Sequence, residues 1–227
     1  MSIHVKICGL ATPDMAERAV DFGADMIGLV FYERSPRHVA TETAADIVRA
    51  IHGKASIVGL FVDPAPARIE MVLSTVRLSH IQLHGSESPD TVAAIRSQSG
   101  LPVIKAAAIS SPGDVARAEQ DYGAIADMLL FDAKPPADAD RPGGNGVSFD
   151  LEALADVTGV RPWLLSGGLT PESVFDAVDG VQPLPGFAGV DVSSGVETAP
   201  GRKDPALMRS FIGAARAAMT DYMDKDA

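Results

Sequence analysis

The only cysteine of the sequence, Cys8, ends a short apolar stretch and lies just before Gly9 and a predicted helix start. Alternation along residues 3–8 puts the apolar side chains on one face and places Lys6 and Cys8 together on the other. A thiol has an ordinary pKa of about 8.5, so at neutral pH it acts as a base only beside a positive charge, which Lys6 could supply. Cys8 is therefore a candidate proton-transfer group, and the alternative is a small buried hydrophobic residue.

Three further polar residues lie where predicted strands end or within a loop. Asp132 follows a strand at 128–131 and opens the longest irregular stretch, 133–147, which is rich in Pro, Asp and Gly. Such a carboxylate either caps the loop or serves as a general acid. His84 follows a strand at 80–83 and is either a functional residue or a packed, hydrogen-bonded core histidine. Arg37 stands in a Ser-Pro-Arg loop, where a surface arginine is the default expectation.

Two glycine-containing turns predict an anion site. Gly167-Gly168 follows a strand at 163–165, and Ser193-Ser194-Gly195 follows a strand at 189–192. Such turns let backbone N–H groups approach an anion closely, and a helix N-terminus adds its dipole. Glycines also simply permit tight turns. Two such turns in adjacent units nevertheless favour phosphate, which eightfold barrels usually bind after strands seven and eight.

These residues require a scaffold that brings strand ends together. Eight strands alternate with helices along 227 residues, which predicts an α/β fold of the closed (βα)8 TIM-barrel type, with its active site at the C-terminal ends of the strands. An open doubly wound sheet also alternates strands and helices, and periodicity alone does not exclude it. No linker divides the chain, so we expect one barrel domain over residues 1–227 with a frayed tail at 221–227.

Several helix boundaries in the last third of the sequence can also be predicted. We expect a short helix at about residues 149–156 and a final helix over about residues 205–219. Between them, Thr170 and Pro171 have the residue types of an N-cap and a first helical position.

The composition restricts the classes of partner. A formal net charge of -11 argues against general binding to nucleic acid or anionic membranes, since both need a basic surface. An anionic ligand would need a locally positive pocket. No apolar run is long enough to cross a bilayer, no signal-peptide pattern opens the sequence, and a lone cysteine fits a reducing cytoplasm. The five histidines are scattered without zinc spacing, so we expect no metal site.

With these residues in view, the chain resembles the phosphoribosylanthranilate isomerases of tryptophan biosynthesis over essentially its whole length. The family usually reads G-G-T-G and then F-D-W, whereas this chain has Asn145 and Leu151 at the corresponding positions, which affects only details of the long loop. The matching segments are K-I-C-G-L at 6–10, S-P-R at 35–37, Q-L-H-G at 82–85, G-G-N-G with Phe149-Asp150, S-G-G-L at 166–169, D-V-S-S-G-V-E at 191–197 and P-G-x-K-D at 200–204.

The resemblance implies an eightfold barrel and an Amadori rearrangement of N-(5-phosphoribosyl)anthranilate to the corresponding 1-deoxyribulose 5-phosphate, with neither metal nor organic cofactor. Asp132 would be the general acid that opens the sugar ring, and Cys8 the general base that removes the C2 proton. A small phosphorylated substrate is then the partner, and we expect a monomer. The other implied roles are substrate binding by Arg37, Asp191 and His84, and phosphate binding by Gly146, Gly168, Ser193 and Ser194.

Two kinds of alternative remain at this point. One is another phosphosugar barrel enzyme. A histidine-pathway isomerase would have aspartates at strand ends one and five, where this chain has Cys8 and Ala107, and an aldolase would need a Schiff-base lysine, for which Lys105 is conceivable. The other is a barrel that binds a phosphorylated ligand without catalysis, which the presence of both Cys8 and Asp132 disfavours.

Overall fold

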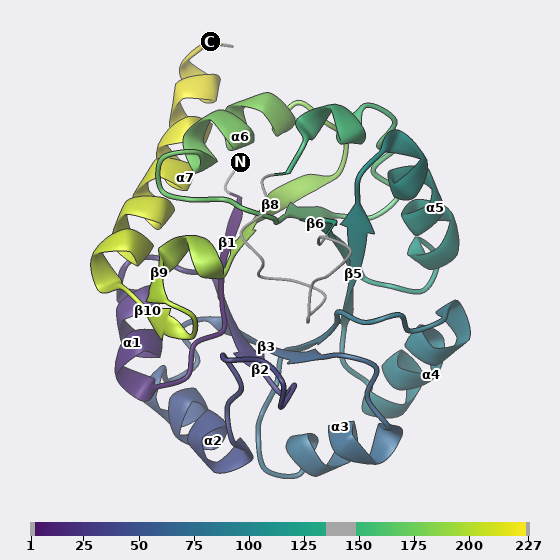
Figure 1. Cartoon of the computed structure of the whole chain (residues 1–227), viewed down its shortest axis with the longest axis vertical. Coiled ribbons are helices and arrows are strands. Elements are labelled where there is room, and N and C mark those ends of the chain that lie inside the picture. The colour runs from purple at the N-terminus through teal and green to yellow at the C-terminus, as the bar shows by residue number, and fades with distance from the viewer. Residues whose placement is uncertain (1–2, 135–148, 226–227) are drawn as a thin grey trace.

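The computed structural model describes residues 3–134 and 149–225, and its centre is a closed barrel of eight parallel strands (Figure 1). The strands pair in chain order, and β8 closes the barrel by pairing with β1. This topology confirms the predicted (βα)8 barrel and excludes the open sheet. The strands are β1 (His4–Cys8), β2 (Met26–Val30), β3 (Ser56–Phe61), β4 (His80–Leu83), β5 (Val103–Ile109), β6 (Met128–Ala133), β7 (Trp163–Leu165) and β8 (Phe187–Val192).

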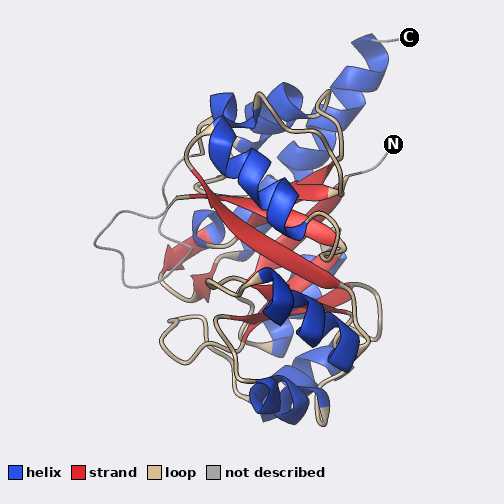
Figure 2. Cartoon of the chain, turned by 90° about the vertical axis from the view of Figure 1, so that its right-hand side faces the viewer, coloured by secondary structure: helices blue, strands red, loops and turns tan. Residues whose placement is uncertain are grey.

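Helices surround the barrel on its outer side (Figures 1 and 2). Two of them begin with a side-chain cap followed by proline: Thr12 and Ser88 accept hydrogen bonds from the backbone N–H groups of Met15 and Thr91. No helix in residues 3–134 and 149–225 combines the length and hydropathy that a membrane span requires. The helices are α1 (Pro13–Asp21), α2 (Thr41–Ala50), α3 (Pro66–Leu73), α4 (Pro89–Ser99), α5 (Pro112–Tyr122), α6 (Val174–Val181) and α7 (Pro205–Lys225).

Three boundaries in the last third of the chain differ from the prediction. The helix expected at 149–156 is one 3-10 turn, η1 (Leu151–Leu154). Thr170 does not cap a helix, because its Oγ1 accepts the backbone N–H of Ser173 (3.3 Å) within a turn, and α6 begins only at Val174. The last helix, α7, continues past its expected end to Lys225.

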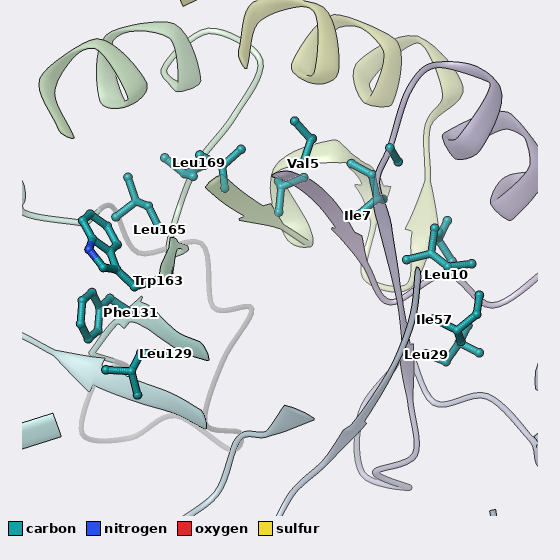
Figure 3. Close-up of a cluster of buried hydrophobic side chains, with 14 of the residues drawn as sticks. Val5, Ile7, Leu10, Leu29, Ile57, Leu129, Phe131, Trp163, Leu165 and Leu169 are labelled. Atoms are coloured by element: carbon teal, nitrogen blue, oxygen red, sulfur yellow. The ribbon is translucent and has the colours of Figure 1, made fainter. Parts of the chain in front are cut away.

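Side chains on the strands alternate between two packed layers. Because Val5 and Ile7 belong to the large layer between sheet and helices (Figure 3), the intervening Lys6 faces the inside of the barrel. Cys8 packs there with Val30 and Leu60, so the predicted two faces of the first strand are confirmed. Deeper inside the barrel lies a compact apolar plug of Met26, Val58, Ile104, Ala106, Leu130 and Leu164.

A short antiparallel hairpin follows β8 and leads into α7 (Figure 1). It consists of β9 (Glu197–Ala199) and β10 (Arg202–Lys203). Its turn residue Gly201 has a φ of 80° and lies so close to the Pro36 carbonyl oxygen that a Cβ would not fit. The hairpin therefore packs against the loop after β2, which carries Arg37.

Candidate active site

Polar side chains gather at the C-terminal ends of the strands. Cys8 ends β1, Asp132 lies at the end of β6, Ser166 follows β7, and Asp191 lies at the end of β8. All four are more than nine-tenths buried. The fold thus brings a thiol, two carboxylates and a hydroxyl to the end of the barrel at which such folds carry their active sites.

Lys6 and Asp191 form a buried ion pair between the adjacent strands β1 and β8. The Lys6 Nζ lies 2.6 Å from Asp191 Oδ1, and the hydroxyl of Ser166 donates to Asp191 Oδ2 over 3.1 Å. Burial alone would lower the pKa of Lys6, but Asp191 and Cys8 together outweigh it and raise that pKa above its ordinary value. Both oxygens of Asp191 therefore have protein partners, so its expected contact with sugar hydroxyls would have to share them.

The Cys8 thiol is only 4% exposed and lies against β2. A Cβ on Gly28 would approach its Sγ to 2.7 Å, so a glycine at this position makes room for the sulfur. Burial raises the pKa of the Cys8 thiol, and the charges of Lys6 and Lys203 oppose that rise. The lysine that the sequence suggested as its activator is thus present, and Asp191 opposes its effect on the thiol.

Asp132 and His84 are in direct contact. Asp132 Oδ2 lies 3.2 Å from His84 Nε2, and His84 Nδ1 lies 3.0 Å from the amide nitrogen of Gln82. Because that amide donates to Nδ1, the Nε2–H of His84 points to the carboxylate. Gln82 is fully buried, and its Oε1 has no hydrogen-bond partner in the described part of the chain. His84 is therefore a partner of the proposed acid as well as a residue of the rim.

Arg37 is buried, contrary to the default expectation of a surface arginine. Its Nε and Nη2 each lie 2.8 Å from an oxygen of Glu197, which gives a bidentate pair. Lys203 Nζ lies 2.7 Å from the same carboxylate. Burial alone would raise the pKa of Glu197, but Arg37 and Lys203 outweigh it and hold that pKa below its ordinary value. Two cations thus share one anion.

The two turns predicted to bind phosphate lie next to each other. Gly167 and Gly168 have φ values of 95° and 64°, which only glycine adopts readily. Gly195, in the turn after β8, lies against the Leu169 carbonyl so closely that a Cβ would not fit. Both turns therefore need glycine for backbone conformation or close approach, and this arrangement also leaves backbone groups accessible without side chains.

The serines of the second turn connect it to the first strand. Ser193 Oγ donates to the backbone carbonyl oxygen of Cys8 over 3.1 Å. Ser194 begins the 3-10 turn η2 (Ser194–Val196). The remaining residue expected to bind phosphate, Gly146, lies outside the described residues.

Lys105, the conceivable Schiff-base lysine, points out of the barrel. Its Nζ lies 2.8 Å from Glu87 Oε2 and donates to the Gly85 carbonyl over 2.8 Å. The other carboxylate oxygen of Glu87 accepts the backbone N–H of Asp63. This buried pair supports the loop after His84 and does not face the strand-end residues, which removes the reason for an aldolase.

Sequence reasoning left three residues of the site without a role, although their side chains are buried. Glu197 and Lys203 lie in recognised motifs, but their contact with Arg37 joins distant parts of the chain and has no local signal. Gln82 carried one usable signal, since a polar residue on the inward face of a buried strand requires a partner. Within residues 3–134 and 149–225, no three His, Cys, Asp or Glu side chains are grouped as metal ligands would be.

Comparisons with known proteins agree with this geometry. A family model described as "N-(5'phosphoribosyl)anthranilate (PRA) isomerase" matches residues 5–214. The N-(5'-phosphoribosyl)anthranilate isomerases of Paracoccus denitrificans (strain Pd 1222) and Rhodopseudomonas palustris (strain BisA53) are each 51% identical to this chain over 217 residues. The alignments cover 96% of this chain and 99% and 97% of those proteins, respectively.

Solved structures give the same answer. The crystal structure of phosphoribosyl anthranilate isomerase from Thermotoga maritima superposes with a TM-score of 0.82 at 36% identity, covering 95% of this chain and 99% of that one. A structure of such an enzyme in complex with reduced 1-(o-carboxyphenylamino)-1-deoxyribulose 5-phosphate gives a TM-score of 0.81 at 35% identity, with the same coverage. By sequence and by fold, this chain belongs to the N-(5'-phosphoribosyl)anthranilate isomerase family.

Proposed function

We propose that this protein catalyses the Amadori rearrangement of N-(5-phosphoribosyl)anthranilate to 1-(o-carboxyphenylamino)-1-deoxyribulose 5-phosphate, a step of tryptophan biosynthesis. The observation that carries the proposal is the pair of buried proton-transfer groups, Cys8 and Asp132, at the C-terminal end of a barrel of this family. An aldose-to-ketose isomerisation needs one acid and one base, and the site contains one candidate for each.

In the first step, protonated Asp132 donates its proton to the furanose ring oxygen of the substrate. The bond from that oxygen to C1 breaks, and the lone pair of the anthranilate nitrogen forms the C1=N bond of a protonated Schiff base. The Nε2–H of His84, 3.2 Å from Asp132, is placed to stabilise the carboxylate that this transfer leaves behind. His84 in this account assists the acid, which extends the substrate-binding role implied for it.

In the second step, the Cys8 thiolate removes the proton from C2. The electrons of the C2–H bond form a C1=C2 bond, and those of the C1=N bond return to nitrogen. The resulting enolamine then tautomerises to the ketone at C2. Because the iminium of the substrate itself accepts the electrons, the two side chains suffice for the reaction.

The two anionic ends of the substrate find complementary groups in the site. Arg37 binds the anthranilate carboxylate through Nη1, which has no protein partner within residues 3–134 and 149–225, while Glu197 fixes the orientation of the guanidinium. Backbone groups of Gly168, Ser193 and Ser194 bind the phosphate, with Gly146 from the long loop. Such donors explain how a protein with a formal net charge of -11 binds an anionic ligand.

The assay that tests the proposal follows the fluorescent substrate in the presence of a strong chelator. Purified protein should consume phosphoribosylanthranilate and form the ketose product without added metal or cofactor. A matched preparation of Cys8→Ala controls for contaminating isomerase from the expression host. Equal rates for the two preparations would refute the assignment, and binding of the reduced product analogue without turnover would favour a non-catalytic barrel.

We further infer that the chain folds as one domain, acts in the cytoplasm and is monomeric. A single hydrophobic layer runs around the barrel, and a lone buried cysteine suits a reducing compartment. One relative with a solved structure is described as a dimeric isomerase, from Thermotoga maritima. Sedimentation equilibrium over a wide concentration range would distinguish the two states, and a constant dimer mass would contradict the monomer.

A further inference from the structure

The charge that favours ionisation of Cys8 is not explained by Lys6 alone. Lys6 is the nearest cation, but Asp191 lies 2.6 Å from its ammonium and opposes its effect on the thiol. The charged groups that face the thiol are Lys6 on β1, Asp191 on β8 and Lys203 on β10. On the β2 side, Gly28 contributes no charge. One cation, Lys203, therefore remains to be accounted for.

Lys203 belongs to a buried cluster with an excess of positive charge. Its Nζ and the guanidinium of Arg37 both contact the single carboxylate of Glu197. Two cations against one anion leave one net positive charge within this cluster. The side chains of all three are at least 94% shielded from solvent, so water screens that charge weakly.

A chain of contacts connects Lys203 to the reactive strand. Its Nζ donates to the backbone carbonyl of Ser193 (2.9 Å) and lies 3.3 Å from the Ser193 hydroxyl. That hydroxyl in turn donates to the carbonyl oxygen of Cys8 over 3.1 Å. The position of Lys203 is fixed from the other side, because the turn of its hairpin packs on Pro36. One residue therefore separates the ammonium from the cysteine.

We propose that Lys203 is a positioning residue of the reaction, whose ammonium adds to the positive field that favours the thiolate of Cys8 and holds Ser193 in place. Glu197 sets the strength of this field, because it shares its negative charge between Lys203 and Arg37. The β9–β10 hairpin thus serves as an electrostatic support for the base. The expected effect of Lys203 on turnover rests on the proposed role of Cys8 as the base. The expected effect on the ionisation of the Cys8 thiol does not.

A titration of the single cysteine tests the proposal directly. The ultraviolet absorbance of the thiolate is followed against pH, and the trace of Cys8→Ser is subtracted to remove the tyrosine contribution. Lys203→Met should raise the midpoint by about one pH unit, the lower end of the effect of a nearby opposite charge. Lys203→Arg, which keeps the charge, should restore most of the shift. An unchanged midpoint in Lys203→Met would overturn the proposal.

A second buried lysine provides a matched control. Lys105→Met also removes a buried ammonium from a lysine–glutamate pair, and Glu87 keeps its backbone N–H partners. The titration midpoint of Cys8 in Lys105→Met should equal that of the wild type. An equal rise in Lys105→Met and Lys203→Met would show that loss of any buried lysine perturbs the thiol, and would overturn the proposal. If Lys203→Met does not fold, Glu197→Gln replaces it. Removing the anion that opposes Lys203 should lower the titration midpoint of Cys8, and an unchanged midpoint would also overturn the proposal.

Kinetics separate this inference from the proposed function. In Lys203→Met, kcat/KM should fall about tenfold near neutral pH, in step with the expected titration shift. The loss should shrink as the pH rises and Cys8 ionises regardless. A loss that is constant with pH would indicate a structural role and contradict the inference. If the titration shifts as expected while the wild type shows no turnover, the proposed function fails and the inference stands.

Discussion

The two ends of β6 carry one aspartate each, and the contacts of the two differ. Asp127, just before the strand, accepts the backbone N–H of Val103 (2.9 Å) and two hydrogen bonds from Arg96 (2.7 and 2.8 Å). Asp132, at the other end, has the imidazole of His84 as its partner and, within the described residues, no backbone hydrogen bond. The first carboxylate binds backbone and arginine groups of the fold, whereas the second has one side-chain partner within the described residues.

The same division holds around the barrel. At the N-terminal end, Asp25 repeats the pattern of Asp127: it accepts the backbone N–H of Val5 (2.7 Å) and pairs with Arg216 (2.6 Å). These pairs are partly exposed and attach a helix to the start of a strand, while the backbone N–H bonds attach that strand to its neighbour. At the C-terminal end the pairs are buried and connect side chains. The contrast shows that the carboxylates at the two ends of β6 differ in their partners as well as in their burial.

The largest effect should come from the base at the C-terminal end. Cys8→Ala should lower kcat/KM by roughly two to four orders of magnitude, because it removes the proposed base for the C2 proton. Since burial raises the pKa of the thiol, wild-type kcat/KM should also increase with pH above neutrality. Stopped assays across pH, with circular dichroism to verify folding, measure both. Turnover that survives in Cys8→Ala, or a wild-type profile that is flat with pH, would contradict the role of Cys8.

A smaller effect is expected from the proposed carboxylate contact. Arg37→Ala should raise KM by about 10- to 100-fold, the value of a hydrogen bond to a charged group, and change kcat less. The fold should persist because Glu197 keeps Lys203 as its partner. Steady-state kinetics with the intact substrate provide the test. Unchanged KM and kcat would remove Arg37 from the site.

The smallest effect belongs to the N-terminal end and concerns stability. Hydrogen bonds from Arg96 lower the pKa of Asp127 in the folded state. The charged carboxylate therefore stabilises the fold above its unfolded pKa of about 3.9, and this contribution is lost as the pH falls through the folded value. Asp127→Asn should cost about 1 kcal/mol of unfolding free energy at neutral pH, allowing for solvent screening. Urea titrations should show that the difference narrows in acid; a constant difference would contradict this sign.

Much of the fold could be predicted because its signals are local. Each strand is a short apolar run, and turn residues such as Ser88 and Pro89 mark helix starts where the structure has them. The same rule failed at Thr170, because a reciprocal turn with Ser173 satisfies the threonine before the helix begins. Local composition also placed the end of α7 too early, since charged residues there suit a helix as well as a tail.

Candidate site residues could be predicted where they lie at the end of a strand. Contacts between residues that are distant in the sequence could not. Cys8 and Asp132 could be named as candidates from their positions, and the family resemblance supplied their expected roles as base and acid. The contact of Arg37 with Glu197 spans most of the chain, so only the closed barrel and its hairpin reveal it. That contact explains why Arg37 is buried. The cation for Cys8 was sought at Lys6, but sequence cannot show that Asp191 lies directly beside it.

The most direct test of the contrast between the two ends of β6 is a comparison of Asp132→Asn with Asp127→Asn. Both substitutions replace a carboxylate by its amide on the same strand or directly before it. We expect kcat/KM to fall by roughly two to four orders of magnitude in Asp132→Asn and to stay close to the wild-type value in Asp127→Asn at a temperature where both are folded. Comparable losses in the two variants, or full activity in Asp132→Asn, would contradict the account.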